Sequence, residues 1–168
     1  MIRRLSLFLV LIFLGSDRAQ AQLAGNKVDV FGGYSYLRLR TSPAANFNGW
    51  ELAGQYRFND WLGGVADVDG HYGKLTGVSS TVHTFLFGPQ VSWPARVSPF
   101  AHVLFGGAHL GGGSFSSTSF SAAIGAGIDT RIARSISWRI IQGDYLLTHF
   151  VGSTQSNARI TTGIVIRF

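Results

Sequence analysis

Histidines are the side chains of this sequence best suited to acid–base chemistry or metal binding near neutral pH. The chain has five of them: His71, His83, His102, His109 and His149. Asp67 and Asp69 precede His71 at alternate positions, and two carboxylates beside an imidazole could form an acid–base pair or a metal site. The same alternation is also the spacing of one face of a β-strand. We therefore interpret these three residues as the inward row of a strand whose charges are paired, and predict neither a catalytic nor a metal site.

The composition excludes several other kinds of chemistry. The chain has no cysteine, so it can form neither a disulfide nor a thiolate metal site. Its net charge of +6 is spread along the chain without a basic run, which argues against nucleic-acid binding. Residues 111–113 are glycines, but no lysine or predicted helix follows them, so they are no phosphate-binding loop. We expect no cofactor. With 13% charged residues the chain also differs from soluble domains, in which about a quarter are charged.

The first 21 residues are typical of a secretory signal peptide. Arg3 and Arg4 precede an apolar stretch at residues 5–15, and residues 19–21 form an Ala-x-Ala cleavage site. The apolar stretch is too short for a transmembrane helix, which needs about 20 residues. No cysteine follows it that could carry a lipid anchor. The sequence therefore predicts export, with cleavage after Ala21 and a mature domain at residues 22–168.

The last twelve residues, 157–168, alternate between two kinds of side chain. One set is apolar except for a threonine: Ala158, Ile160, Thr162, Ile164, Ile166 and Phe168. The other set contains an arginine near each end of the segment, Arg159 and Arg167. A period of two is the period of a strand. An apolar face opposite a face with charges is typical of a strand with lipid on one side and a polar lumen on the other.

This alternation recurs eight times along the mature chain. The predicted strands are residues 27–37, 47–58, 62–72, 81–93, 98–109, 119–131, 135–146 and 157–168. Tight connectors follow the second, fourth and sixth strands, and longer connectors rich in Gly, Ser and Thr follow the others, at residues 38–46, 73–80, 110–118 and 147–156. Short turns on one side and longer loops on the other are typical of an outer-membrane barrel. The fold class we predict is all-β, an eight-stranded antiparallel transmembrane β-barrel with up-and-down topology.

The inward positions of these strands collect most of the charge. They hold five acids and five arginines: Asp29, Glu51, Arg57, Asp67, Asp69, Asp129, Arg131, Arg139, Arg159 and Arg167. Buried charges persist when they are paired, so we predict a mutually neutralising lumen network, with Asp129 opposite Arg139 and Asp29 near Arg167. In the seventh strand Gln142 breaks the alternation, as does Asp144 after it. This predicts either a bulge near Ile141 or a strand that leaves the membrane there.

Four features resemble the small eight-stranded outer-membrane barrels of the OmpA and OmpX type. They are the opening segment FGGYSY at residues 31–36, the strand at residues 49–58, the pair Asp144–Tyr145 and the terminal Phe168. The resemblance implies a location in the outer membrane of a Gram-negative envelope, with outer-membrane lipid around the barrel. It also implies that the barrel-assembly machinery reads Phe168. Unlike OmpA, the chain ends with the barrel, so we expect no peptidoglycan-binding domain.

Several alternatives remain open. A soluble sandwich or a lipocalin would bury its apolar face instead of its charges, and the Gly-x-Trp motif of lipocalins is absent. A lipid A deacylase of similar size has a His-x-Ser motif, and no histidine here is followed by serine at that spacing. We therefore expect no enzyme, but a structural or surface-interaction protein that acts through four extracellular loops. A narrow, porin-like pore is the first alternative, and an outer-leaflet lipid-modifying enzyme is the second.

Overall fold

The computed structural model describes residues 27–40, 44–75, 77–113, 115–150 and 153–168, except for the side chains of residues 115, 149, 150, 153 and 154. The predicted signal peptide and its cleavage site lie outside the described residues. Eight strands make up the fold: β1 (Val28–Leu39), β2 (Ala45–Arg57), β3 (Leu62–Leu75), β4 (Val78–Ser92), β5 (Val97–Gly112), β6 (Phe115–Arg131), β7 (Ile136–Phe150) and β8 (Ser153–Arg167). No helix in the described part of the chain is long and apolar enough to span a membrane.

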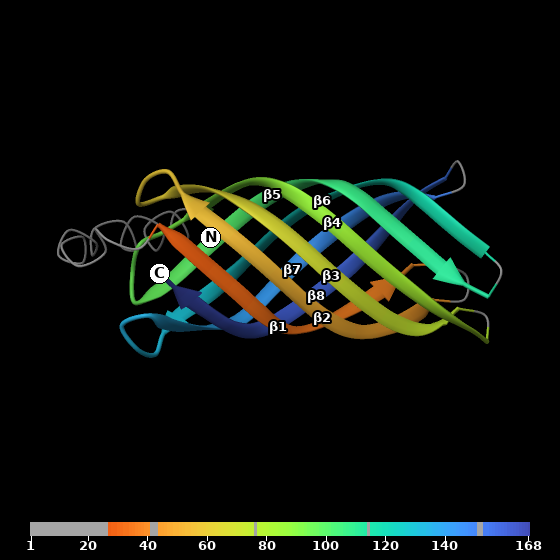
Figure 1. Cartoon of the computed structure of the whole chain (residues 1–168), viewed down its shortest axis with the longest axis horizontal. Helices are drawn as coiled ribbons and strands as arrows, with labels where there is room; N and C mark the ends of the chain where they lie inside the picture. Colours follow the sequence, from red (N-terminus) through yellow and green to blue (C-terminus); the bar gives the residue numbers. More distant parts are fainter. Residues whose placement is uncertain (1–26, 41–43, 76, 114, 151–152) are drawn as a thin grey trace, which may run out of the picture.

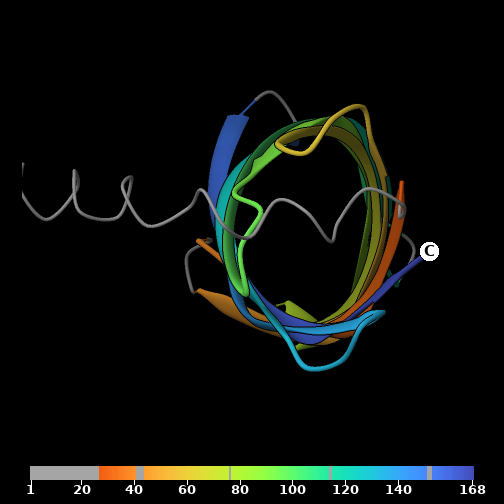
Figure 2. The ribbon, with the colours of Figure 1, turned by 90° about the vertical axis from the view of Figure 1, so that its left-hand side faces the viewer.

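The strands form one closed barrel in chain order. Each strand pairs antiparallel with the next one, and β8 pairs with β1 to close the ring, so the predicted fold class is confirmed. Figure 1 shows the strands inclined to the long axis, and Figure 2 shows the ring seen from one end. The start of β1 and the end of β8 lie together at that end, because Asp29 is the register partner of Arg167. We call it the terminal end, and the opposite end the far end.

Each strand has an apolar outer face and a more polar inner face. Outward side chains are exposed on every strand, for example Tyr34, Leu52, Tyr72, Phe87, Val103, Ile124, Ile140 and Ile164. Successive side chains of a strand point to opposite faces, so the residues between them are turned into the barrel. The apolar outer belt ends toward the far end, where Asn48, Lys74, His109 and Thr118 are exposed on the same surface. This pattern is that of a barrel whose outer wall contacts hydrocarbon.

Aromatic side chains border this belt, as is typical of the interfaces between a membrane and water. Tyr34, Trp50 and Tyr72 are exposed, and the first two are register partners on β1 and β2. Tyr34 and Tyr36 donate hydrogen bonds to asparagine side chains of β2, at 2.5 and 2.8 Å. Their hydroxyls therefore have polar partners at the point where the apolar belt ends, which suits an aromatic ring at an interface.

Three of the four predicted long connectors are wrong as loops, whereas β1 ends at Leu39 and β2 begins only at Ala45, which leaves the longer connector predicted there. β3 reaches Leu75 and β4 already begins at Val78, and the connectors between β5 and β6 and between β7 and β8 are equally tight. The Gly-, Ser- and Thr-rich segments mostly continue the strands, because β-propensity depends on pairing context and these residues still pair across the hairpin. As a result the strands have 12 to 17 residues, more than the 9 to 11 or so that cross a membrane when tilted. The surplus lies at the far end.

The bulge in β7 is confirmed, and the strand continues beyond it. The pairing of β7 with both neighbours shifts between Arg139 and Gln142, and Ile140 and Ile141 are both exposed. Two consecutive outward residues return Gln142 and Asp144 to the inner face. A bulge adds one residue to a strand without ending its pairing, which explains the broken alternation.

Side chains fill the inside of the barrel. Toward the far end, the interior is mostly apolar and includes Leu37, Leu39, Phe47, Val82 and Leu110, with the buried hydrogen-bonded pair of Asn157 and Thr148 beside them. Toward the middle and the terminal end it becomes polar and charged, with residues such as Glu51, Asp67, Arg139 and Arg159. An eight-stranded barrel has an interior just wide enough for side chains to fill, so packing and ion pairing share the same core.

Candidate functional site in the barrel lumen

Arg159 of β8 is the centre of the lumen. Its side chain is 0% exposed, yet it carries a permanent charge. Its Nε lies 2.8 Å from Asp144 Oδ2 and 3.5 Å from Glu51 Oε2, its Nη1 and Nη2 lie 3.1 and 3.2 Å from the two Asp67 oxygens, and Nη1 also donates to Asp69. One guanidinium thus ties together β2, β3, β7 and β8. Because the fork of five N–H donors has a fixed geometry, it specifies how these strands sit around it.

Two histidines contact two of the carboxylates around Arg159. His71 Nδ1 lies 3.2 Å from Asp69 Oδ1, and His102 Nε2 lies 2.8 Å from Asp144 Oδ1. Thr84 adds to the first pair, since its hydroxyl donates to Asp69 Oδ2 at 2.6 Å. All these side chains are buried. A buried carboxylate is stable only when its oxygens are hydrogen-bonded, and these contacts meet that need.

Asp69, His71 and Ser35 have the order of a catalytic triad. His71 Nε2 lies 2.9 Å from Ser35 Oγ, and its other ring nitrogen contacts Asp69. A nucleophilic serine also needs open space for a reacting carbonyl. Ser35 is completely buried, and its hydroxyl has Thr161 Oγ1 at 3.1 Å on its other side. The arrangement therefore works as a hydrogen-bond chain, and Thr161 continues it to Glu51 Oε2 at 2.7 Å.

Gln142 connects the centre to the terminal half of the lumen. Its amide donates to Glu51 at 3.0 Å and to Asp144 at 2.8 Å, while its carbonyl accepts from Arg139 Nη1 at 2.6 Å. The Arg139 guanidinium also lies between the rings of Phe31 and Phe100, at 4.3 and 4.2 Å from their centroids. Such cation–π contacts favour a desolvated arginine. The ionic network therefore continues from the centre toward the terminal end.

The two predicted ion pairs differ in the distance between their charged groups. Asp129 and Arg139 are register partners, with Nε–Oδ1 and Nη2–Oδ2 distances of 2.9 and 3.2 Å. Asp29 and Arg167 are also register partners, but their closest ionic contact is 4.0 Å, from Nε to Oδ2. Arg57 holds Asp29 instead, with its Nε at 3.1 Å from Oδ2 and a second contact from Nη2. Of the two strands next to β1, β2 thus supplies the closer arginine.

The ten residues of the predicted lumen network all lie on the inner face or its terminal rim. Eight are buried, and Arg57 and Arg131 are half-buried. Sequence reasoning left Asp144 and Gln142 out of the network because the bulge shifts their parity. It also left out His102, although this histidine stands at an inward position of the predicted fifth strand. Phe168, predicted as an assembly signal, is exposed on the outer wall.

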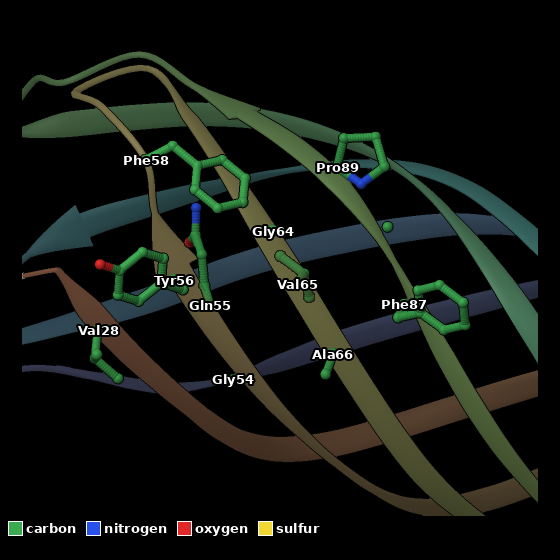
Figure 3. A pocket seen from close by; sticks show the side chains of 11 residues that line it. Val28, Gly54, Gln55, Tyr56, Phe58, Gly64, Val65, Ala66, Phe87 and Pro89 are labelled. Carbon is green, nitrogen blue, oxygen red and sulfur yellow. The ribbon is translucent and has the colours of Figure 1, made fainter.

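A recess on the outer wall contains no group suited to catalysis. It lies over β2, β3 and β4, and Figure 3 shows Tyr56, Phe58, Phe87 and Pro89 around it. Its floor includes Gly54, Gly64 and Ala66, whose small side chains leave the wall hollow. These outward residues belong to the apolar belt, so the recess faces hydrocarbon. Among the residues that the structure describes, no group of three His, Cys, Asp or Glu side chains is placed to hold a metal ion.

The geometry defines a class of protein. A closed antiparallel barrel with an apolar outer belt, bordering aromatics and an ionic interior is a transmembrane β-barrel. A family model described as outer membrane protein beta-barrel domain matches residues 6–168. The chain belongs to this family of outer-membrane β-barrel proteins, which agrees with the resemblance seen in its sequence. No curated protein sequence matches the chain.

Solved structures of small outer-membrane proteins are similar in fold. Neisserial surface protein A (NspA) has a TM-score of 0.73 at 13% identity, over 84% of this chain and 97% of that one. OprG of Pseudomonas aeruginosa has a TM-score of 0.60 at 10% identity, over 85% and 96%. Ail, the attachment invasion locus protein of Yersinia pestis, in complex with the heparin analogue sucrose octasulfate, has a TM-score of 0.55 at 18% identity, over 84% and 97%.

Proposed function

We propose that this outer-membrane barrel is not an enzyme and acts as a structural or surface-interaction protein. The observation that carries the proposal is the filled lumen. Arg159 and the carboxylates around it occupy the middle, and apolar side chains such as Phe47 and Val82 occupy the far half. The outer wall faces lipid. The surface that we propose for binding is the far rim, where the strands extend beyond the length that a membrane requires.

The charges at the far rim indicate the chemistry of a partner. Arg38, Arg40 and Lys74 are exposed there, at the ends of β1 and β3. The acids of the described residues lie in the lumen or in the turn after β2: Asp29, Glu51, Asp60, Asp67, Asp69, Asp129 and Asp144. A rim with cations and no described acid attracts anions, so the partner we propose is an anionic surface polymer such as a sulfated polysaccharide. The complex of Ail with a heparin analogue supports this choice of partner class.

Binding to immobilised heparin tests the proposal. The folded barrel, in nonionic detergent, should be retained on heparin and not on neutral dextran. A triple variant with Arg38, Arg40 and Lys74 changed to Gln should elute at clearly lower salt, because each lost contact removes a counterion-releasing charge. The matched control changes Arg96 and Arg134, which are exposed in turns at the terminal end. Equal losses in both variants, or no retention of the native barrel, would contradict binding at the far rim.

A narrow pore is the second candidate. One observation favours it, a small cavity inside the terminal half that is lined by Asp29, Gln55, Gln90 and Arg139 among others. The far half opposes it, because its mostly apolar side chains fill the lumen, and a hydrophobic constriction hinders the passage of ions. Planar-bilayer recordings decide between the two functions. Regular conductance steps that vanish when Arg139 is changed to Ala would favour the pore, and a silent barrel would favour the surface role.

A further inference from the structure

At the terminal end of the lumen, the arginines outnumber the acids. Asp29 is held by Arg57, and Asp129 is held by Arg139. Arg131 and Arg167 of β6 and β8 then have no acid of their own, apart from the 4.0 Å contact of Arg167 with Asp29. Arg57 and Arg131 are the like charges that act on the Arg167 guanidinium, and Asp29 and Asp129 are the opposite charges that act on it. In the terminal part of the lumen, these four arginines therefore face only two acids, Asp29 and Asp129.

These two arginines also have unused hydrogen-bond donors. Arg167 is only 6% exposed, and no described residue accepts a hydrogen bond from its Nε. The buried Nε of Arg131 is likewise without a partner among the described residues. Ser137, between them on β7 and 0% exposed, has an unpartnered hydroxyl, and it is the register partner of Arg131. Buried donors normally have partners, so three unpartnered ones on adjacent strands indicate a missing acceptor.

We propose that this end of the lumen binds a small oxyanion, with phosphate as the type ligand, between Arg131, Ser137 and Arg167. Planar guanidinium groups bind phosphate oxygens through paired N–H donors, and a serine hydroxyl can donate a further bond. The anion neutralises the two uncompensated charges, which buried groups require. Asp29 Oδ1 is an unpartnered acceptor in the same region, so the anion lies on the Arg131 side of Arg167. The site is independent of the proposed surface role.

The ligand chemistry has two sources, free phosphate and a phospholipid headgroup at the barrel mouth. Titration of the full barrel with inorganic phosphate, in nonionic detergent at low salt, addresses the first source. The arginine Nε–H signals in NMR spectra are the readout. The signals of Arg131 and Arg167 should shift and saturate. A second arm places the barrel in phosphatidylglycerol nanodiscs without free phosphate, where the same shifts would identify the headgroup as the ligand. Saturable shifts in either arm support the site, and their absence in both overturns it.

Variants separate a built site from diffuse attraction. Changing Arg131 or Arg167 to Gln should weaken phosphate binding about tenfold, which is the effect of one charge-assisted hydrogen bond. Arg134→Gln is the matched control, because this arginine is exposed in the turn at the same end. An equal loss in the control would overturn the proposal. Should the arginine variants not fold, Ser137→Ala decides. Binding weakened by about threefold or more supports the site, since a lost hydrogen bond has at least this effect, and unchanged binding overturns it.

Discussion

Asp129 and Arg139 face each other across the β6–β7 hairpin, and two parallel hydrogen bonds of 2.9 and 3.2 Å join their side chains. The pairing register shifts immediately beyond this pair, where the bulge of β7 begins. The ion pair therefore fixes the last regular position of the hairpin before the irregularity. Arg139 is further held by Gln142 and by the rings of Phe31 and Phe100.

A double-mutant cycle measures this coupling. Arg139→Met should lower the free energy of unfolding more than Asp129→Asn, because Arg139 has additional partners. The double variant should be less destabilised than the sum of the two, by about 1–3 kcal/mol, since each single change leaves a buried group without its partner. Urea unfolding in lipid vesicles gives all four values. Strict additivity would show that the two side chains are not energetically coupled.

Arg159→Met removes the positive charge from the centre of the lumen. The carboxylates of Asp67, Asp69 and Asp144 would then face each other in a buried space, together with Glu51. We expect a loss of at least about 3 kcal/mol in the free energy of unfolding, which is typical when one partner of a buried ion pair is removed. Arg96→Met is the control, because an exposed arginine should change stability by about 0.5 kcal/mol or less. Similar effects of both substitutions on urea unfolding would contradict the central role of Arg159.

Gly125 makes room for the pair of His102 and Asp144. A Cβ atom at this position would lie 1.8 Å from Asp144 Oδ1 and 2.7 Å from His102 Nε2. Gly125→Ala should therefore displace this pair and destabilise the barrel by about 1–3 kcal/mol, as overpacking does. Gly143→Ala is the control, because nothing lies within 4 Å of the corresponding Cβ. The unfolding midpoints in urea compare the two variants, and a Gly125→Ala barrel as stable as the control would contradict the prediction.

The barrel could be predicted from the sequence because parity is a strong signal when hydrocarbon lies on one side and charge on the other. A shift of one residue in strand register would turn the side chain of Asp67 or Arg139 toward the lipid, where an arginine near the midplane costs about 2–4 kcal/mol. The same rule failed at Asp144, since a bulge leaves a strand paired but changes its parity. Ser35 and Thr161 were missed for a different reason. Their roles depend on contacts between strands distant in sequence, which a single-strand pattern does not contain.

The far-end connectors show another limit of the sequence. Gly, Ser and Thr mark loops only statistically, and here the strands pair through them, up to Leu75 and Val78 for example. Whether a residue pairs depends on its neighbour across the hairpin. The choice of Asp29 between Arg57 and Arg167 was also not predictable, because both arginines lie on strands next to β1, and only their side-chain reach separates them.

Single-residue deletions test the bulge. Ile141 and Ile160 are both outward isoleucines, exposed by 49% and 48%. Deleting Ile141 removes the extra residue of the bulge and leaves Arg139, Gln142 and Asp144 all turned inward. Deleting Ile160 instead inverts the inward and outward orientation of the side chains on one side of the deletion in the regular strand β8. Either Arg159 would then point toward lipid, or both Thr161 and Arg167 would. We expect the first variant to fold and the second to fail.

Circular dichroism and protease resistance after refolding into lipid vesicles distinguish these results. The Ile141 deletion should give a protease-resistant β-barrel, and the Ile160 deletion should remain protease-sensitive. Ile141→Ala and Ile160→Ala serve as controls, and both should fold, because each keeps the chain length and the parity. Failure of the Ile141 deletion together with success of its alanine control would show that the bulge itself is required for closure of the barrel.

A substitution at Phe168 can separate effects on assembly in the cell from effects on the stability of the folded barrel. Its backbone N–H donates to Val28 O at 2.8 Å at the β1–β8 seam, while its side chain is 64% exposed on the outer wall. Phe168→Ala keeps the backbone hydrogen bond and removes only apolar contact with lipid. The free energy of unfolding in vesicles should therefore fall by no more than about 2 kcal/mol. If the side chain is the signal that the assembly machinery reads, the same variant should be strongly depleted from outer membranes of expressing cells. Ile166→Ala, another outward position on β8, is the control. Equal depletion of both variants would mean that the machinery reads the apolar strand as a whole and not its last aromatic residue.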